Sequence, residues 1–360
     1  MLLRKCLAAI ALLSMWLAPL SSHAAATYTV TLLPGVDFAV TGMNNAGQMV
    51  GFAGNGAGSV QAVLYSGGVL ERLGTFGGTG SYGQAINDAG AIAGTFIAAS
   101  GEHHGFLYQD GRFIDIGAGT SGEGINARGD VVGGRQNDDG MNGYLYSDGA
   151  VRDIRNLRTG KIGIAYDIND VGQVAGTSTI AFRTTDPAVH PFLYRKGDTL
   201  DLGALGDNHV TRGIAINNVG QIAGDSEGAD GGHAFLDSGS GMLDLGGFGE
   251  GSLTVHDLNE HGTLVGTASN EETGLIPFIN VGNVLVDLNT LIDPTLGWQL
   301  FSAYANNDLG QIVGWGSQGE TCGLVRLDVT AAVPEPAGAL LLLPGLLLLG
   351  AARRSTIVPA

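Results

Sequence analysis

The amino-acid sequence predicts an all-β protein, a seven-bladed β-propeller of four-stranded antiparallel blades. Three observations predict this fold. An Asn-x-x-Gly turn, followed by an apolar run that ends in glycine, recurs seven times at intervals of 39 to 48 residues. Each repeat holds four short apolar stretches, and four strands in about 40–45 residues are typical of a propeller blade. No part of the repeat region keeps a 3.6-residue apolar period, so we expect little helix.

The turn asparagines occupy one equivalent position in every repeat. An asparagine side chain caps its own turn, and the glycine three residues later supplies the positive φ that a tight hairpin needs. We therefore expect each turn to join the first strand of a unit to the second. The seven asparagines are Asn44, Asn87, Asn126, Asn169, Asn217, Asn259 and Asn307.

The second repeat shows the four apolar stretches clearly. The first ends at Ile86 and the second ends at Gly94, while the third reads Phe-Leu-Tyr at 106–108 and the fourth Asp-Ile-Gly at 115–117. Each stretch spans about 4–6 residues between turn residues, which is a length that fits strands. In the last repeat we expect Gly-Leu-Val-Arg at 323–326 to correspond to Gly-Phe-Leu-Tyr at 105–108.

The two ends of the repeat region complement each other. The last repeat stops after its third stretch, residues 323–329, and an extra apolar stretch at residues 28–33 precedes the first repeat. We expect this N-terminal strand to complete the last blade, because joining the ends removes exposed sheet edges. The alternative is a parallel β-helix or solenoid, but its coils need nearly equal lengths, and the variable intervals fit loops on blades better.

Composition excludes several classes of protein. The chain has 360 residues, 61 glycines without a three-residue period, 44% hydrophobic residues and a net charge of −17. These values exclude collagen and a disordered chain. The acidic balance excludes a nucleic-acid partner, which would require clustered lysine and arginine. Between residues 25 and 332 there are 13 basic and 33 acidic residues, a net charge of −20, which suits a soluble exported protein.

Residues 1–24 have the pattern of a secretory signal peptide. Arg4 and Lys5 precede an apolar segment at residues 6–20, and small residues lead to a cleavage site for signal peptidase after Ala24, with Ala26 as a second choice. The alternative, a retained membrane anchor, is disfavoured because the apolar segment is short for a membrane span. The mature repeat domain is therefore expected at residues 25–332.

Residues 333–360 form a second targeting segment. Pro334, Glu335 and Pro336 precede an apolar run at 337–352, which is followed by Arg353 and Arg354. The run predicts a transmembrane helix whose arginines stay on the cytoplasmic side. This order resembles the PEP-CTERM sorting signal of Gram-negative bacteria. The resemblance implies transient anchoring in the inner membrane, cleavage by an exosortase and delivery to the cell surface or extracellular matrix.

The PEP-CTERM resemblance leaves two points open. Residues 355–360 extend the chain beyond the length that this family leads us to expect. The alternative for the segment is a plain C-terminal anchor. Some ice-binding proteins also carry this type of tail, so the tail does not decide what the repeat domain does.

The repeats themselves resemble the HAF repeat of bacterial extracellular proteins. Leu-Gly-Thr-Phe-Gly-Gly at 73–78 with Ala-Ile-Asn at 85–87 resembles its core, and His-Ala-Phe-Leu at 233–236 contains its naming triplet. The likeness covers nearly the whole repeat domain and is weaker in the first and last units. The resemblance implies the repeat architecture and an export route, and it implies no particular activity.

Several motifs have both a chemical and a structural interpretation. The G-x-S-x-G match at 224–228 lacks the strand–turn–helix context of a catalytic serine, and the G-x-G-x-x-G matches at 78–83 and 117–122 lack a following helix. We interpret all three as chance matches in a glycine-rich chain. His104, His190 and His233 share one repeat position, where structural histidines are favoured over a shared metal.

Two further groups of residues have open interpretations. Asp88, Asp170 and Asp308 follow turn asparagines, and oxygen-rich turns of this kind can bind calcium. Cys322 is the one cysteine of the repeat domain. We predict a buried and inert thiol there, with a bond between two chains as the alternative.

The sequence favours a non-enzymatic function. We predict an exported binding or scaffold module of the exopolysaccharide or biofilm matrix, with no cofactor and no identifiable catalytic group. One alternative is an enzyme that acts on polysaccharide through an acidic pair in the central channel. A less favoured alternative is an ice- or surface-binding protein.

Overall fold

The computed structural model describes residues 27–330 except 57, 181–187 and 207–209. The predicted signal peptide at 1–24 and the predicted sorting segment at 333–360 lie outside the described residues, as does the predicted helix at 337–352. Residues 27–330 form one compact unit. Within the described part of the chain no helix is long and apolar enough to cross a membrane.

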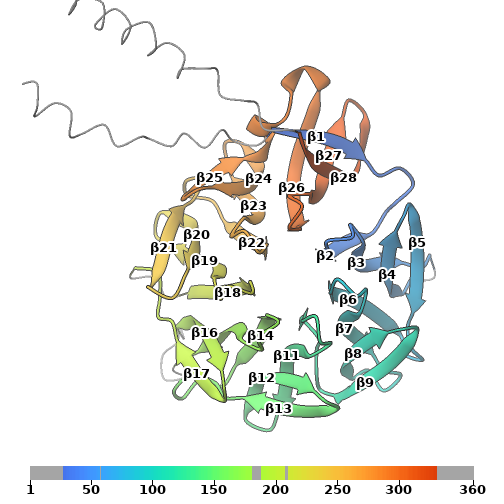
Figure 1. The fold of residues 1–360 in the computed structure, drawn as a ribbon, viewed down its shortest axis with the longest axis vertical. Coiled ribbons are helices and arrows are strands. Elements are labelled where there is room, and N and C mark those ends of the chain that lie inside the picture. The colour runs from blue at the N-terminus through green and yellow to red at the C-terminus, as the bar shows by residue number, and fades with distance from the viewer. Residues whose placement is uncertain (1–26, 57, 181–187, 207–209, 331–360) are drawn as a thin grey trace, which may run out of the picture. The chain divides into compact units, whose positions relative to one another are not determined.

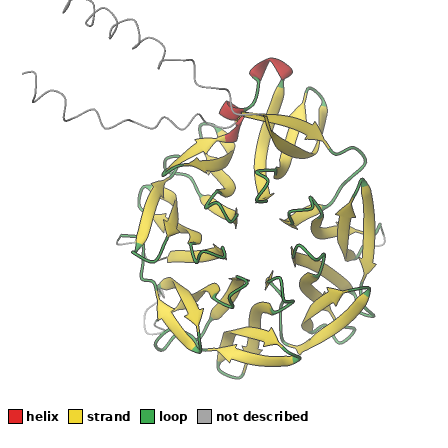
Figure 2. Cartoon of the chain, in the orientation of Figure 1, coloured by secondary structure: helices red, strands yellow, loops and turns green. Residues whose placement is uncertain are grey.

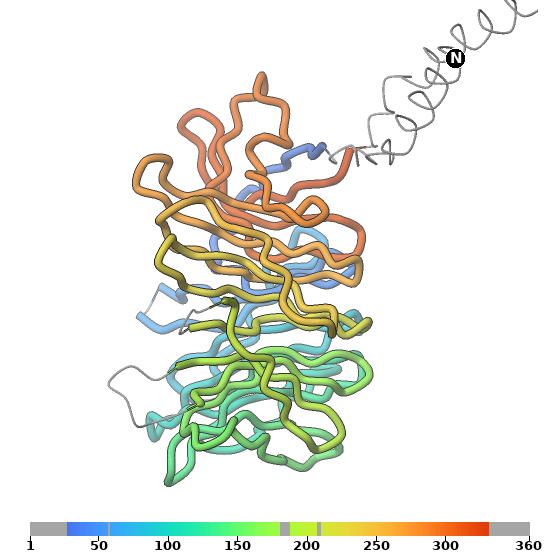
Figure 3. The backbone as a smooth tube through the Cα atoms, turned by 90° about the vertical axis from the view of Figure 1, so that its left-hand side faces the viewer, coloured from blue at the N-terminus to red at the C-terminus, as the bar shows by residue number. Residues whose placement is uncertain are grey.

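The strands of this unit form seven four-stranded antiparallel blades around a central channel, within the described residues (Figures 1 and 2). The first strand of each blade lies nearest the channel, and in Figure 3 the strands run across the ring from one face to the other. This confirms the predicted propeller, and the β-helix alternative is wrong.

The blades are numbered in chain order, and the four strands of each of the first blades are consecutive in the sequence. Blade 1 contains β2 (Ala39–Met43), β3 (Met49–Gly54), β4 (Val60–Ser66) and β5 (Val69–Gly74). Blade 2 contains β6 (Gly80–Ile86), β7 (Ile92–Ile97), β8 (His103–Gln109) and β9 (Arg112–Ala118). Blade 3 contains β10 (Gly124–Ile125), β11 (Val131–Asn137), β12 (Gly140–Ser147) and β13 (Ala150–Ile154). Blade 4 contains β14 (Gly163–Ile168), β15 (Val174–Thr179), β16 (Val189–Arg195) and β17 (Asp198–Asp201).

The remaining blades follow the same order. Blade 5 contains β18 (Val210–Ile216), β19 (Ile222–Gly228), β20 (Gly231–Asp237) and β21 (Met242–Gly246). Blade 6 contains β22 (Leu253–Leu258), β23 (Leu264–Asn270), β24 (Gly274–Val281) and β25 (Val284–Asp287). Blade 7 contains β26 (Trp298–Asn306), β27 (Ile312–Gln318), β28 (Thr321–Thr330) and β1 (Thr27–Leu32). The helices among the described residues are two short 3-10 turns, η1 (Leu288–Leu291) and η2 (Pro294–Leu296).

The N-terminal strand closes the ring as predicted. β1 pairs antiparallel with β28 in blade 7, from Thr27 opposite Thr330 to Leu32 opposite Val325. The predicted alignment of residues 323–326 with residues 105–108 is wrong by one residue. Gly314 of β27 lies opposite Val325, whereas Gly94 of β7 lies opposite Phe106, so Val325 and not Leu324 takes the place of the phenylalanine.

Proline substitutions in β1 test this closure. The Leu33 N–H donates to the Leu324 carbonyl, so alternation along the ladder directs the Thr31 N–H toward β28 and the Val30 N–H away from it. We expect Thr31→Pro to lose at least about 3 kcal/mol of the free energy of unfolding, and Val30→Pro to lose clearly less. Denaturant unfolding of both variants measures the difference. Equal losses would contradict closure through this register.

A repeated glycine on the second strand lets the blades form. In every blade, a Cβ added at this glycine would lie 1.7–2.3 Å from a backbone carbonyl oxygen, which belongs to the first strand or, in blade 3, to Ser121 just before it. In six blades the first strand bulges next to this contact. Only glycine therefore allows the two strands to approach this closely. The seven glycines are Gly51, Gly94, Gly133, Gly176, Gly224, Gly266 and Gly314.

An aromatic ring from the third strand covers this glycine in blades 2 to 6. These rings are fully buried between neighbouring blades and form the centres of the interblade cores. They belong to Phe106, Tyr144, Phe192, Phe235 and Phe278. Blade 1 has the smaller Val63 at this position, and there the Phe38 ring lies against Gly51 instead.

Candidate functional site

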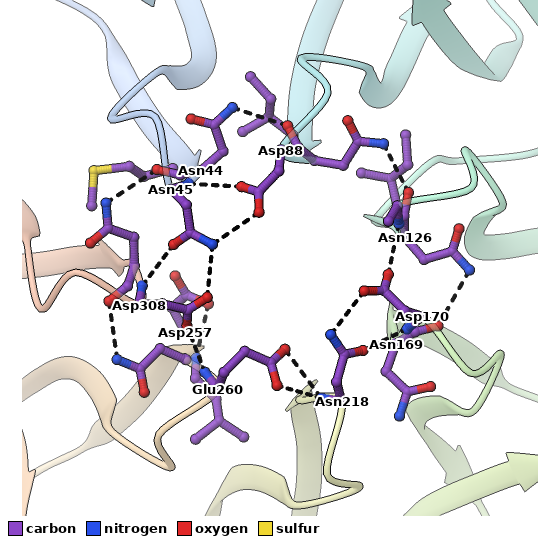
Figure 4. Close-up of a pocket in the computed structure, with 18 of the residues that line it drawn as sticks. Asn44, Asn45, Asp88, Asn126, Asn169, Asp170, Asn218, Asp257, Glu260 and Asp308 are labelled. Atoms are coloured by element: carbon purple, nitrogen blue, oxygen red, sulfur yellow. Dashed lines mark hydrogen bonds between the residues drawn. The ribbon is translucent and has the colours of Figure 1, made fainter.

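The structure brings the seven turn asparagines together around one mouth of the channel (Figure 4). The amide Nδ2 of each asparagine donates to the backbone carbonyl of the asparagine in the next blade, at 2.9–3.3 Å. The last link runs from Asn307 back to Asn44 at 3.2 Å. Seven buried hydrogen bonds thus form a closed ring, which we call the asparagine ring.

Each asparagine also holds its own turn. In Asn217 the Oδ1 atom accepts the Gln221 N–H at 2.9 Å, and Nδ2 donates to Gln221 Oε1 at 2.8 Å. The turn glycines have φ between 73° and 84°, as at Gly47 and Gly220. The sequence predicted the contact within the turn. It did not predict the hydrogen bond between blades, although an asparagine at the same position in all seven repeats could have indicated a ring of such bonds.

A second ring of polar side chains lies one residue further along the chain. The backbone N–H of this residue donates to the side chain of its counterpart in the next blade in six of the seven steps among the described residues. The links start at Asn45, Ala127, Asp170, Asn218, Glu260 and Asp308. The step from Asp88 lacks such a bond because Ala127 has no polar side chain.

Two carboxylates lie deeper in the channel and join neighbouring blades. Asp257 accepts the Leu258 N–H at 2.8 Å and the Asn306 N–H of the next blade at 2.9 Å. Asp167 bonds in the same way to the N–H groups of Ile168 and Ile216. Burial raises the pKa of Asp257 to about 7 and that of Asp167 to about 6, although these N–H groups act in the opposite direction.

Asp257 gives a pH-dependent prediction. Its pKa is higher in the folded chain than the value of about 4 in an unfolded chain, so its contribution to stability is complete below pH 4 and is lost as the pH rises through about 7. We expect the stability of Asp257→Ala, relative to the unaltered chain, to rise by on the order of 2 kcal/mol over this range. Denaturant unfolding from pH 4 to 8 measures it, with exposed Asp198→Ala as the control. The same pH profile in both variants would contradict the prediction.

The channel wall below these carboxylates carries further ionisable groups. Glu123, Tyr166 and His256 line a polar cavity of about 170 Å³. Burial raises the pKa of Glu123 and lowers that of His256. Arg212 binds Asp225 at 2.8 Å and also contacts Glu227, so its charge is neutralised within blade 5.

The geometry assigns most of these groups to holding the blades together. Both oxygens of Asp167 and of Asp257 accept backbone N–H groups from two adjacent blades, so each carboxyl group fixes one blade against the next. Glu123 differs, because its carboxylate forms hydrogen bonds with side chains, with Gln84 at 3.3 Å and with Ser121. The mouth of the channel is therefore a rigid, polar and acidic opening.

The histidines of the repeat position are paired within their own blades. Nδ1 of His104, His190 and His233 lies 2.8–3.0 Å from Asp115, Asp201 and Asp244 respectively. Each of these aspartates also accepts the N–H of the glycine two residues later. The three histidines lie in three different blades, and each pair fixes the third strand to the end of the fourth.

The other predicted motifs lie in regular repeat structure. Residues 224–228 belong to strand β19, and the Ser226 hydroxyl bonds to the Thr211 hydroxyl at 2.9 Å. Asp88, Asp170 and Asp308 belong to the second polar ring and accept N–H groups. Among the described residues, no group of three or more His, Cys, Asp or Glu could hold a metal ion.

The prediction of a buried cysteine is wrong. Cys322 is exposed at the start of β28, next to the turn that joins it to β27. The expectation rested on its place at the start of a predicted strand and on the burial that free cysteine usually shows. A residue at the first positions of a strand lies at the edge of the blade, where the neighbouring blade does not cover it.

Comparison with known proteins supports the fold. No protein-family model and no curated protein match the chain. The β-propeller domain of the Trilobed protease from Pyrococcus furiosus, described with an open velcro topology, matches with a TM-score of 0.51 and 7% identity. The match covers 84% of this chain and 93% of that one.

A structure described in a study of two prolyl endopeptidases matches with a TM-score of 0.54 and 13% identity, over 86% of this chain. The match covers 49% of that chain, so the present chain spans about half of its length. TolB from Acinetobacter baumannii matches with a TM-score of 0.45 and 13% identity. The match covers 68% of this chain and 62% of that one. At these identities the likeness establishes the propeller fold alone.

Proposed function

We propose that this chain is exported and acts at the cell surface or in the extracellular matrix as a non-enzymatic propeller that binds exopolysaccharide. The proposed route starts with cleavage after Ala24 and ends with exosortase processing near Pro334. The sequence patterns at the two ends support this route, and the acidic repeat domain suits a soluble exported protein.

One observation carries the non-enzymatic part of the proposal. A glycosidase needs two carboxyl groups that are free to exchange a proton or attack the sugar. In the described channel, Asp167 and Asp257 each use both oxygens to bind backbone N–H groups of adjacent blades. Groups committed in this way stabilise a rigid ring, and a rigid ring is a suitable frame for a binding site.

A polysaccharide array with the purified full chain tests the proposal, with and without calcium. We expect retention of at least one polysaccharide whose chain length, measured by size-exclusion chromatography, stays unchanged. A fall in chain length would establish the alternative, an enzyme that acts on polysaccharide. No retention of any polysaccharide would overturn the binding function.

The export route has a separate test. Mass spectrometry of the protein recovered outside the cytoplasm should give an N-terminus at Ala25. Cells that lack the exosortase should retain a form that still contains Arg353 and Arg354. An intact N-terminus at Met1 in the exported protein would contradict the route.

A further inference from the structure

A pocket lies where the last blade meets the first, and one residue of blade 6 also lines it. It has a volume of about 560 Å³, within the range of about 300–1,000 Å³ that is usual for small-molecule sites. Phe301, Tyr304 and Trp315 of blade 7 contribute aromatic rings, and Asp37 and Leu275 line its edge. We call this space the aromatic pocket.

The aromatic pocket arises where the repeat pattern is broken. Blades 2 to 6 place a large ring from the third strand between neighbouring blades, but blade 1 has Val63 there. Trp315 lies eight residues after its turn asparagine, where blades 2 to 6 carry Thr, Gly or Asp. The first strand of blade 7 also has an additional irregularity between Leu300 and Ser302, and this bulge sets the direction of Phe301.

Polar groups accompany the rings. Asp37 is exposed, and Ser302 and Tyr304, two further lining residues, each carry a hydroxyl group. Among the described residues none of these three side chains has a hydrogen-bond partner in the structure, in contrast to the committed carboxylates of the channel. The Tyr304 ring makes an edge-on contact with the His256 ring, and the two ring centroids are 6.2 Å apart.

We infer that the aromatic pocket binds a neutral or amino-substituted pyranose ring of a glycan. A pyranose presents C–H groups on its faces and hydroxyls at its edge, so aromatic faces and uncommitted polar groups together match its chemistry. The carboxylate of Asp37 and the net charge of −20 over residues 25–332 disfavour an anionic sugar. This inference rests on the proposed function and names its site and ligand class.

The position of the pocket also suits an extended ligand. The first strand of each blade runs toward the asparagine ring, so β28 ends and β1 begins on that face, at Thr330 and Thr27. Asp37 precedes β2, and Leu275, which is 48% exposed, stands at the start of β24, so both lie on the opposite face. The pocket therefore opens away from the points where the chain enters and leaves the propeller.

Tryptophan fluorescence gives a direct test. The sequence has three tryptophans, so the full chain with Trp16→Phe and Trp298→Phe retains Trp315 as its single reporter. We expect a saturable change in its emission with cellotriose or N-acetylated chitotriose, and none with trigalacturonic acid. The absence of any response to both neutral trisaccharides, or a response to the acid alone, would overturn the inference.

Matched variants separate this inference from the proposed function. We expect Trp315→Ala and Phe301→Ala each to weaken glycan affinity about tenfold or more, as removal of a central aromatic contact does. Phe52→Ala is the control, because Phe52 has the same place in blade 1 as Trp315 in blade 7 and contacts Tyr82 instead. Thermal unfolding of Phe52→Ala and of Phe301→Ala shows whether each of these two variants is folded.

The outcomes are distinguishable. If the unaltered chain retains a polysaccharide and the two pocket variants retain it equally well, the aromatic pocket is not the site and the proposed function stands. If the unaltered chain retains none, the proposed function and this inference both fail. If Trp315→Ala instead converts a dimer to a monomer in sedimentation without a change in glycan affinity, a second copy of the chain occupies the pocket and the inference is wrong.

Discussion

The Gly266→Ala variant is expected to lose about 3 kcal/mol or more of the free energy of unfolding. The added methyl group would lie 2.2 Å from the Thr254 carbonyl oxygen and 2.4 Å from Cζ of the Phe278 ring. Neither neighbour can move easily, because the carbonyl belongs to the first strand of the blade and Phe278 is fully buried. The strands would have to separate to accommodate one methyl group.

Gly54→Ala is the matched control for this prediction. Gly54 ends β3 and has no heavy atom within 4 Å of the Cβ that alanine would add. We expect a change within about 0.5 kcal/mol. Guanidinium unfolding of the two variants and the unaltered chain measures both values. A loss at Gly266 no larger than at Gly54 would contradict the close approach of the first two strands.

Asn217→Asp should be nearly as destabilising at neutral pH, although the two side chains have almost the same shape. Asn217 is buried and its Nδ2 donates to the Asn259 carbonyl and to Gln221 Oε1. An aspartate would place an oxygen against both acceptors. We expect a loss of about 2–4 kcal/mol, the combined result of two missing buried hydrogen bonds and the repulsion between oxygens.

Acidification gives this prediction a distinctive signature. Repulsion by two oxygen acceptors raises the pKa of the introduced carboxyl in the folded chain, and the protonated form donates one hydrogen bond. The variant should therefore recover part of its stability, relative to the unaltered chain, as the pH falls toward about 4. Asn217→Ala should show the loss without the recovery, and exposed Asn283→Ala should show neither. A pH-independent deficit in Asn217→Asp would contradict the ring geometry.

The gap in the second polar ring shows how much the repeat pattern alone can reveal. The position after each turn asparagine is polar in six repeats and alanine in one, which the sequence displays directly at Ala127. The meaning of the polar residues appears only when the ring is closed, because each accepts a hydrogen bond from the neighbouring blade. Asp88 and Asp308 therefore join blades, although in the sequence they were candidates for calcium binding.

The deep carboxylates and the aromatic pocket could not be predicted from the sequence. Asp167 and Asp257 stand at a position where other repeats have glycine or alanine, but nothing local indicates that their side chains reach the next blade. Phe301 owes its direction to a bulge, and a bulge depends on pairing with another strand. Cys322 was misjudged for a related reason, since exposure at a strand end depends on the neighbouring blade.

The sequence by itself determined the number of blades, the four strands in each, the turn positions and the closure by the N-terminal strand. These features follow from local turn chemistry and from the period of the apolar stretches, which are repeated seven times in one chain. Only the tertiary structure decided which side chains cross between blades, which carboxyl groups are committed, and where a space remains. Those properties depend on distances between segments of neighbouring blades, such as Val63 of blade 1 and Trp315 of blade 7, which share one hydrophobic cluster although they lie far apart in the sequence.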